Sequence, residues 1–586
     1  MSYRDLMATL QCKTTQGRKY WYIVESRRVN GKPRPVVLAY LGKTEDIMKR
    51  LASSSSAPSR IKSYSHGLVY ALCDKAALLN IVGIINRYAE ANRSYMAKQP
   101  IINGLTAGET ILLAAIGRAC RPTSKQAWVD WANTTSLGYL LRPIVNKLDS
   151  QHFWDHMDCL SEDGIEKIEA DLIENVWKNY DIKTDTLLFD TTNFFTYINT
   201  TNSRCTIAKR GKNKQKRTDL RQVGYALVVT REDHIPLFQH TYIGNQPDCI
   251  TFRKVIEKIK ARLLLLHLDF TKHTLVFDKG MPTKENFELI DTLQCSYVTS
   301  IKLGGNKDLL ESFKGSAEEI LMNEEKILVS RYHKKICGKE RIAIVYFSES
   351  LRQGLMQGFK ELITKISKLL DDVHSKLCTA KRKIDPEKKK AQIEKIIGKK
   401  LKGVIECQLV ENGQKWGLQY SIREDKLEEL RQKVGFKILV SDREEWSSVD
   451  IIRAYNGQAA VEEEFKNTKN PFHLAFRPQY HWTDQKIRVH FLICFIAHLL
   501  SRLLYKEAKG KLKFVWQLNT LLEKLNSIRI ASYVVEGKAG KEKSANYRIE
   551  YMLEDASDEQ KKLIDAFSIG TQDNVTGRVF SCGVYK

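Results

Sequence analysis

Two hydrophobic runs of this chain end abruptly at an aspartate, and this repeated pattern constrains the fold more than any other feature. One run reads TDTLLFD and ends at Asp190; the other reads HTLVFD and ends at Asp278. Short apolar runs bounded by polar residues are typical of buried strands. If both strands are parallel neighbours in one sheet, their carboxylates lie at the same open edge, where functional groups collect in α/β proteins. The alternative is that each aspartate caps the turn after its strand.

The segments around these runs predict a mixed sheet. Strands are predicted at 184–190, 223–230, 235–244, 273–278 and 295–303, and helices at 250–268 and near 283–293. The order along the chain is βββαβαβ. The fold class is therefore α/β, with a mixed sheet.

The rest of the chain divides into several units, because 586 residues exceed the size at which one core keeps growing. We predict an N-terminal β unit (1–50), a helical domain (61–180), the first part of the α/β core (181–303), an insertion domain (304–440), the second part of the core (441–510) and a C-terminal extension (511–586). Asn30-Gly31 predicts a hairpin turn, and the serine-rich residues 51–60 predict a linker. The apolar stretch 491–500 is too short to span a bilayer, so we expect a buried helix.

The charge balance favours a polyanionic partner. The chain has 94 Lys and Arg against 69 Asp and Glu, a formal net charge of +25. Nucleic acid, an anionic membrane surface and plain solubility are all compatible with this excess. The twelve cysteines lie at least 29 residues apart, which excludes a CxxC zinc motif and favours a reducing compartment. Because the N-terminus has no apolar signal-peptide core, we expect a cytosolic protein.

A basic loop follows the first predicted strand of the core. Residues 208–221 read AKRGKNKQKRTDLR, with seven basic residues and one acidic residue. We predict that its cations contact a DNA backbone, since phosphate neutralisation is the usual source of nonspecific affinity. These cations are Lys209, Arg210, Lys212, Lys214, Lys216, Arg217 and Arg221. The alternative is a solvated hairpin, and the lysine-rich stretch 381–402 is likewise either a solvated helical face or a DNA contact.

A third segment, 454–469, predicts a helix with a charged stripe. It reads AYNGQAAVEEEFKNTK, in which Tyr455, Glu462 and Lys469 are spaced seven apart and so share one face. Paired carboxylates hold Mg²⁺ through oxygen ligands, so the glutamate can complete a metal site with the two aspartates. The tyrosine and lysine can contact phosphates. The alternative is a surface helix with a coincidental spacing, since exposed Glu and Lys are common.

The two aspartates and this stripe resemble the DDE signature of insertion-sequence transposases with a ribonuclease-H-like core. The stripe is similar to their Y-(2)-R-(3)-E-(6)-K motif, which selects Glu462 over Glu463 and Glu464. The motif's arginine falls on Gln458, a departure that leaves its phosphate contact absent or supplied elsewhere. Further similar runs include GRKYWYIVESRRVNGKPRPVVLAYLG, KRTDLRQVGYALVVTREDHIPLFQHTYIGNQPD and RPQYHWTDQKIRVHFLICFIAHLL, so the resemblance extends from about residue 10 to 540.

The resemblance implies Mg²⁺-dependent DNA cleavage at transposon ends and attack of the freed 3′-hydroxyl on target DNA. Asp190, Asp278 and Glu462 would be the catalytic metal ligands for two Mg²⁺ ions, with Mn²⁺ as a substitute. Tyr455 and Lys469 would orient DNA phosphates. The helical domain (61–180) would serve in DNA binding or dimerisation. The implied partners are double-stranded DNA and a second copy of the chain in a synaptic homodimer, with no membrane. The implied location is the bacterial cytoplasm, on the nucleoid when bound.

Two other functions remain open from the residues alone. One is a metal-dependent nuclease or resolvase on the same core, and the other is a domesticated, noncatalytic DNA-binding protein. The three intact acidic positions argue against the second. Trp416 and Trp446 either stack on an unpaired base or pack as ordinary tryptophans. His473 and His481 are expected to be ordinary polar or packing residues, because Mg²⁺ sites use oxygen ligands.

Overall fold

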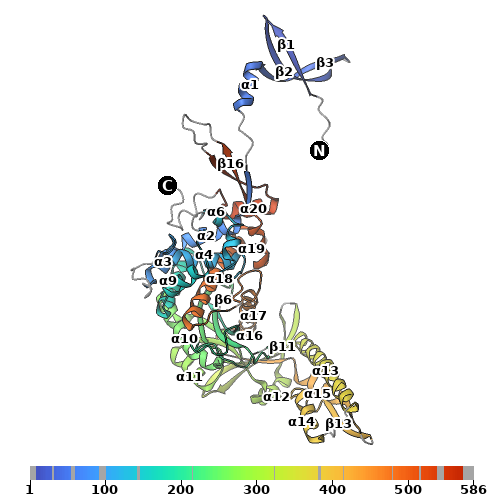
Figure 1. Ribbon diagram of the computed structural model, residues 1–586. Coiled ribbons are helices and arrows are strands. Elements are labelled where there is room, and N and C mark those ends of the chain that lie inside the picture. Colours follow the sequence, from blue (N-terminus) through green and yellow to red (C-terminus); the bar gives the residue numbers. More distant parts are fainter. Residues whose placement is uncertain are drawn as a thin grey trace.

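A computed structural model of the protein describes residues 8–29, 32–53, 60–90, 101–140, 145–213, 215–322, 324–379, 385–412, 415–477, 479–513, 516–536 and 547–571. The described chain is mixed α/β, with one large sheet and many helices (Figure 1). A layer of helices lies above this sheet in Figure 1, and the N-terminal strands stand apart at the top.

One side of the large sheet consists of five strands with two connecting helices. These elements are β5 (Thr186–Thr196), β6 (Arg221–Thr230), β7 (Pro236–Ile243), α10 (Asp248–Leu265), β8 (Thr274–Phe277), α11 (Lys284–Leu293) and β9 (Ser296–Ile301), with 3₁₀ turns η1 (Phe270–Lys272) and η2 (Leu303–Gly305). β5, β6 and β7 pair antiparallel, whereas β5, β8 and β9 run parallel. The element order is βββαβαβ, as the hydrophobic pattern predicts.

Alternating side chains of β5 pack on opposite faces of the sheet. Leu187 and Phe189 belong to the apolar cluster that contains Phe252 of α10. Leu188 belongs to a second cluster, which contains Ile451 of α16 (Ser448–Asn456). A strand covered by helices on both faces carries apolar residues at successive positions. This explains why the run before Asp190 lacks the polar alternation of a half-exposed strand.

The helical layer is built around one long apolar helix. Its members are α2 (Gly67–Leu78), α3 (Ile81–Tyr88), α4 (Ala107–Cys120), α5 (Trp128–Ala132), α6 (Ser136–Leu140), α8 (Ser150–Asp158), α9 (Glu162–Asn179) and α18 (Asp484–Lys511). Among the described helices, α18 is long and apolar enough to cross a membrane, and the pair α2 and α3, bent by 58°, passes the same test together. The apolar window of α18 is 94% buried against α2, α4, α8 and α9. This burial is typical of a core helix, as predicted for residues 491–500.

The predicted insertion, 304–440, is divided differently in the structure. After α12 (Lys307–Ser316), strands β10 (Glu318–Met322), β11 (Glu325–Ile336), β12 (Lys339–Phe347) and β15 (Phe436–Ser441) extend the large sheet, which has nine strands in the order β10-β11-β12-β15-β9-β8-β5-β6-β7. β15 covers the edge of β9 that would otherwise expose unpaired backbone groups. A separate unit with its own apolar cluster comprises α13 (Glu349–Cys378), α14 (Pro386–Ile397), β13 (Ile405–Asn412), β14 (Lys415–Ile422) and α15 (Glu424–Lys433), at the lower right of Figure 1.

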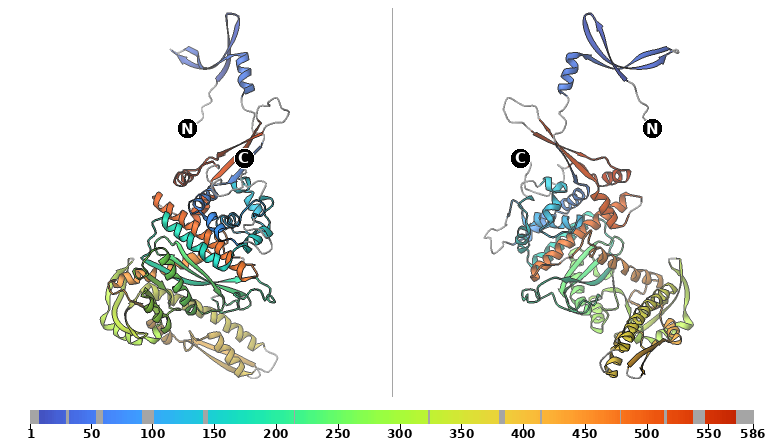
Figure 2. Two further views of the ribbon diagram at one scale, coloured as in Figure 1. Left: turned by 90° about the vertical axis from the view of Figure 1, so that its left-hand side faces the viewer. Right: turned by 45° about the vertical axis from the view of Figure 1, so that its right-hand side comes forward.

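The two ends of the chain contribute small sheets. β1 (Ala8–Thr15), β2 (Arg18–Val29) and β3 (Lys32–Lys43) form an antiparallel sheet followed by α1 (Thr44–Ser53); the predicted turn at Asn30-Gly31 lies outside the described residues. β4 (Arg60–Ser65) pairs with β16 (Arg529–Glu536), which pairs with β17 (Tyr547–Leu553); α19 (Leu518–Asn526) and α20 (Asp558–Phe567) flank these strands in sequence. Figure 2 shows this sheet between the N-terminal unit and the helical layer. The C-terminal extension is thus joined to a strand near the start of the chain, which the local sequence pattern does not predict.

Candidate active site

Asp190 and Asp278 lie side by side just beyond the parallel pairing of β5 with β8. Asp278 follows the last residue of β8, as predicted, whereas β5 continues past Asp190 to Thr196 by pairing with β6, so this strand does not end at its aspartate. β5 and β8 are neighbours, with Leu188 opposite Val276, and each aspartate follows two residues later. Both residues are half-buried. The backbone N–H of Thr191 donates to Oδ1 of Asp190 over 2.7 Å. The register therefore brings two carboxylates from distant parts of the chain to the same edge of the sheet.

Tyr455, at the end of α16, contacts the second aspartate. Its hydroxyl lies 3.1 Å from Oδ1 of Asp278 and 3.0 Å from Oγ of Ser300 on β9. Burial, with the charge of Asp278, raises the pKa of Tyr455 above its usual value. The phenol therefore keeps its proton and donates a hydrogen bond to the carboxylate. The sequence predicts a phosphate contact for Tyr455; in the described structure this side chain orients Asp278.

Two further contacts hold the next helix, α17 (Gln458–Asn467), over β5. The side-chain amide of Gln458 donates to the backbone carbonyl of Phe189 over 2.8 Å, one residue before Asp190. Nζ of Lys469 lies 2.5 Å from Oγ1 of Thr192. Gln458, which replaces the motif's arginine, thus ties the helix to the strand that carries the first aspartate.

The predicted single helix is divided at Gly457, although its backbone stays helical at φ −55° and ψ −20°. A Cβ at Gly457 would lie 3.0 Å from the carbonyl oxygen of Ala454 and 3.3 Å from Cγ of Arg231. Glycine therefore permits this close approach of the helix to the start of the β6–β7 turn.

Glu462 is exposed on the face of α17 that also carries Gln458, one turn earlier. The ammonium group of Lys437, on β15, lies 5.2 Å from the centroid of the Tyr455 ring. Burial lowers the pKa of Lys437, while the carboxylates of Asp278 and Glu462 oppose this shift. Lys437 therefore lies within electrostatic range of both acids.

The donor set suits a hard divalent cation, because carboxylate oxygens are the ligands that Mg²⁺ prefers. Within the described ranges, however, no three His, Cys, Asp or Glu side chains come close enough to hold a metal ion. The structure thus brings Asp190 and Asp278 to one edge, but it does not gather Glu462 with them into a closed site.

Comparison with known proteins identifies the family. The family model described as "Transposase DDE domain" matches residues 187–500, more than half of the chain. The chain belongs to the DDE transposase family. A second model, "IS1634 family transposase, N-terminal domain", matches residues 10–63. The protein is therefore an insertion-sequence DDE transposase, an enzyme of the polynucleotidyl transferase and endonuclease class.

One solved structure with a similar chain is a cryo-EM structure of the piggyBac transposase synaptic complex with hairpin DNA. It has 9% sequence identity to this transposase and a TM-score of 0.37, and the alignment covers 78% of each chain. That similarity is too low to inform the site. No curated protein matches the chain.

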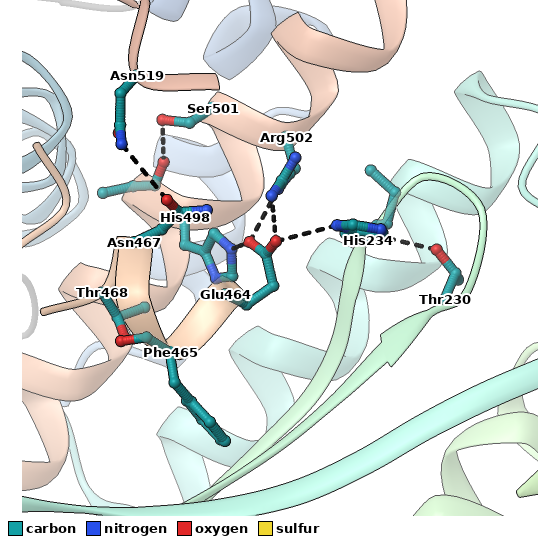
Figure 3. Close-up of polar contacts among 12 residues, drawn as sticks. Thr230, His234, Glu464, Phe465, Asn467, Thr468, His498, Ser501, Arg502 and Asn519 are labelled. Carbon is teal, nitrogen blue, oxygen red and sulfur yellow. Dashed lines mark hydrogen bonds and ion pairs between the residues drawn. The ribbon is translucent and has the colours of Figure 1, made fainter. Parts of the chain in front are cut away.

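A buried ion-pair network lies under the candidate catalytic helix of this transposase (Figure 3). Glu464, two residues after Glu462, is fully buried and accepts hydrogen bonds from Arg502 and His498 of α18, with 2.8 Å from Nε of Arg502 to Oε2. Nδ1 of His234, in the β6–β7 turn, lies 3.1 Å from Oε1. The network fixes α17 to α18 and to the large sheet.

This network distinguishes the three consecutive glutamates by their surroundings. Burial alone would raise the pKa of Glu464, but the guanidinium of Arg502 and the hydrogen bonds from the two histidines hold it well below its usual value. Glu464 is therefore an ionised structural residue, whereas Glu462 and Glu463 are exposed. The sequence contains a signal for this: His498 and Arg502 are one turn apart in an apolar helix, and buried cations need an acidic partner.

The basic loop lies between β5 and β6, and its cations differ in their surroundings. Arg217 pairs with both oxygens of Asp219, at 2.8 and 2.7 Å. Arg221 donates to the backbone carbonyls of Asn202 and Thr200 and so holds the loop in place. Lys209, Arg210, Lys212 and Lys216 are exposed, and Lys214 lies outside the described residues. Arg217 and Arg221 thus already have protein partners.

The tryptophans and histidines singled out in the sequence pack against other side chains. Trp416 is half-buried beside the apolar cluster of the α13–α15 unit. Trp446 is half-buried, with the guanidinium of Arg443 5.5 Å from its ring centroid. His473 contacts the carbonyl of Ala119 at 3.0 Å.

His481 is buried beside the ring of Trp154, with 5.2 Å between centroids. Burial lowers its pKa well below the usual value, so the imidazole is neutral. The environments of both histidines are those of packing residues.

Proposed function

We propose that this transposase uses Asp190, Asp278 and Glu462 to cleave DNA at transposon ends with Mg²⁺ and to join the freed 3′-hydroxyl to target DNA. The register of β5 with β8 carries this proposal. It makes the two aspartates neighbours where the parallel pairing of these strands stops, within the matched DDE domain. If each aspartate only capped the turn after its own strand, nothing would require the two to lie next to each other.

The proposed core is ribonuclease-H-like. Its βββαβαβ order supports this, with three antiparallel strands followed by two strands parallel to the first. The helix carrying the glutamate follows the strands after a long separation, as expected for a core interrupted by an insertion. The division into N-terminal β unit, helical domain, split core, insertion and C-terminal extension belongs to the same proposal, with β10, β11, β12 and β15 assigned to the sheet.

Two Mg²⁺ ions would be held by Asp190 and Asp278, with Glu462 as a further ligand; Mn²⁺ would substitute. When bound, the ions supply Lewis-acid stabilisation of the attacking and leaving oxygens in a phosphoryl displacement. Tyr455 donates to Asp278 and orients its carboxylate. Lys469 and Lys437 add positive charge beside a bound phosphate. Gln458 and the Glu464 network keep α17 over β5, so that Glu462 remains near the edge of the sheet.

The proposed partners follow from the same chemistry. A transposase with a net charge of +25 meets double-stranded DNA at transposon ends and at the target. Pairing two ends favours a homodimer in the synaptic complex. The proposed location is the bacterial cytoplasm, on the nucleoid when DNA is bound.

A strand-transfer assay tests this function. The full-length protein is incubated with Mg²⁺ and DNA that flanks its own coding region, and separately with precut ends bearing a 3′-hydroxyl. We expect cleavage and end joining in the wild type, and a loss of about a hundredfold or more in Asp190→Asn, Asp278→Asn and Glu462→Gln. Glu463→Gln is the matched control, because Glu463 is an exposed neighbour on the same helix.

The alternatives predict other outcomes. A nuclease would cut without joining precut ends. A noncatalytic DNA-binding protein would show no difference between the wild type and Asp190→Asn. Loss of activity in Glu463→Gln but not in Glu462→Gln would reassign the third acid.

A further inference from the structure

Three aromatic side chains lie exposed at the far end of the strand that carries Asp190. They are Tyr197, Tyr480 and Trp482, with 48%, 60% and 39% of their surfaces exposed, and we refer to them as the aromatic platform. The rings of Tyr197 and Tyr480 lie 5.5 Å apart. The N–H of Tyr197 donates to the carbonyl of Gln479 over 3.0 Å, so the backbone holds the two segments together.

The basic loop is fixed beside this platform. The guanidinium of Arg204 lies 5.2 Å from the ring centroid of Trp482. Asp484, at the start of α18, accepts from the backbone N–H groups of Thr206 and Ile207 at 2.7 and 3.1 Å. These bonds anchor the chain just before Lys209, where the run of exposed cations begins. Arg217 of the basic loop lies within electrostatic range of the Tyr197 hydroxyl, so cations lie beside the aromatic rings.

This combination favours one kind of ligand. Exposed aromatic groups gathered on a surface mark an interaction site. A protein partner matches an apolar patch with apolar contacts, whereas the rim of this patch is cationic. Basic residues that follow a phosphate backbone, together with aromatic rings that stack on bases, bind single-stranded nucleic acid. A paired duplex hides the faces of its bases, so the platform fits bases that are unpaired.

The strand β5 relates the platform to the two aspartates. Asp190 lies near its middle, Thr192 with Lys469 follows, and Tyr197 comes directly after its last residue. Seven residues of extended chain cover about 23 Å. Stacked nucleotides rise about 3.4 Å each along one strand, so this distance corresponds to about seven nucleotides.

We propose that the aromatic platform binds unpaired bases of the transposase's DNA substrate, about seven nucleotides from the phosphate at Asp190 and Asp278. The distance rests on the proposed function, since it is counted from the proposed cleavage site. The stacking itself does not, because it depends only on Tyr197, Tyr480, Trp482 and the neighbouring cations. The loop cations hold the backbone, and the rings hold the bases.

A binding experiment with full-length protein tests the stacking. Fluorescence anisotropy in EDTA compares a labelled, fully paired duplex with the same duplex carrying a short unpaired segment. We expect the wild type to prefer the unpaired segment, and a Tyr480→Ala/Trp482→Ala variant to bind it roughly five- to hundredfold more weakly. Tyr480→Phe/Trp482→Phe keeps the rings and should restore the preference.

Leu321→Ala is the matched control for loss of an exposed apolar side chain. Leu321 is 67% exposed on β10, six strands away from β5 in the sheet. Equal binding of both DNAs by the wild type, or an undiminished preference in the double alanine variant, would overturn the stacking proposal.

The position is tested with 2-aminopurine, whose fluorescence falls when it stacks. Scanned along the unpaired strand of a cleavable end, it should be quenched most strongly about seven nucleotides from the cut, and this maximum should vanish in Tyr480→Ala/Trp482→Ala. A quenching maximum next to the cut, or one retained in that variant, would contradict the position. The two proposals can fail independently. If the wild type did not cleave DNA but still preferred the unpaired segment, the proposed catalysis would be wrong and the stacking proposal would stand.

Discussion

At the scale of single residues, the candidate site depends on groups that orient the acids as well as on the acids themselves. Tyr455 donates to Asp278, and its raised pKa keeps it a donor throughout the neutral range. Glu464 is ionised and buried two positions from Glu462. Neither role can be recognised from sequence spacing, because spacing predicts which residues share a helix face but not what that face contacts.

Replacing Tyr455 by phenylalanine removes the hydrogen bond to Asp278 without opening a cavity. A hydrogen bond to a charged group contributes about 1.5–3 kcal/mol. We expect Tyr455→Phe to require roughly tenfold more Mg²⁺ for half-maximal cleavage. A Mg²⁺ titration of cleavage measures this, and an unchanged titration curve would exclude the orienting role. Tyr332→Phe, on β11 of the same sheet, is a control tyrosine.

The Glu464 network predicts a pH dependence of stability. Because the folded-state pKa of Glu464 lies below its unfolded value of about 4.3, its stabilising contribution is complete above that pH and is lost as the pH falls below it. We expect Glu464→Gln to lower the free energy of unfolding by about 3–5 kcal/mol at neutral pH, since it leaves Arg502 buried without its charge partner. Thermal unfolding between acidic and neutral pH measures both effects.

The double variant Glu464→Leu/Arg502→Met is the control for that experiment. It removes both charges and keeps similar volumes, so it should recover much of the lost stability. If the single and double variants were equally unstable, packing rather than charge pairing would explain the effect.

At the scale of elements, the hydrophobic pattern predicts most of the core. Buried strands and amphipathic helices can be recognised from the local spacing of their apolar residues. The strand before Asp278 and the helices on either side of it lie where the pattern predicts. The strand at Asp190 begins as predicted but continues to Thr196, because its polar residues still pair with β6. The pattern does not predict the break at Gly457, because the backbone there stays helical and only the approach of Arg231 requires the small residue.

The basic loop should contribute to DNA affinity through the cations that form no ion pair with a carboxylate among the described residues. Lys212 and Lys216 are exposed, whereas Arg217 is paired with Asp219. In Lys212→Ala/Lys216→Ala, we expect the slope of log K against log salt to fall by roughly 0.9 for each phosphate that the variant no longer neutralises. The matched control, Arg217→Ala/Asp219→Ala, leaves the net charge unchanged and should alter the slope little. Equal slopes in all three proteins would remove the loop from the DNA interface.

At the scale of the whole molecule, the limits of the insertion are the feature that local sequence predicts least well. The strands β10 to β12 have strand-like sequences, but nothing in those sequences says which sheet they join. The pairing of β12 with β15 connects segments about ninety residues apart, and such pairing is set by the final packing rather than by periodicity.

The α13–α15 unit should be removable without unfolding the sheet. Phe347 and Phe436 face each other in the β12–β15 register, so a two-residue Asn-Gly turn can replace residues 348–435. The unit keeps its own apolar cluster, so its loss exposes little of the main core. We expect the shortened protein to stay soluble, to unfold cooperatively on heating and to bind duplex DNA. Aggregation, or loss of cooperative unfolding, would show that the unit supports the sheet.

The pairing of β4 with β16 has a consequence for how the protein is made. The hydroxyl of Ser65 donates to the carbonyl of Asn526, 461 residues further along, so this sheet closes only after the residues of β16 have left the ribosome. In a chain released before β16 is made, the strand β4 that follows the N-terminal unit has no partner strand. The small sheet of this enzyme would thus assemble only from messages that are translated past β16.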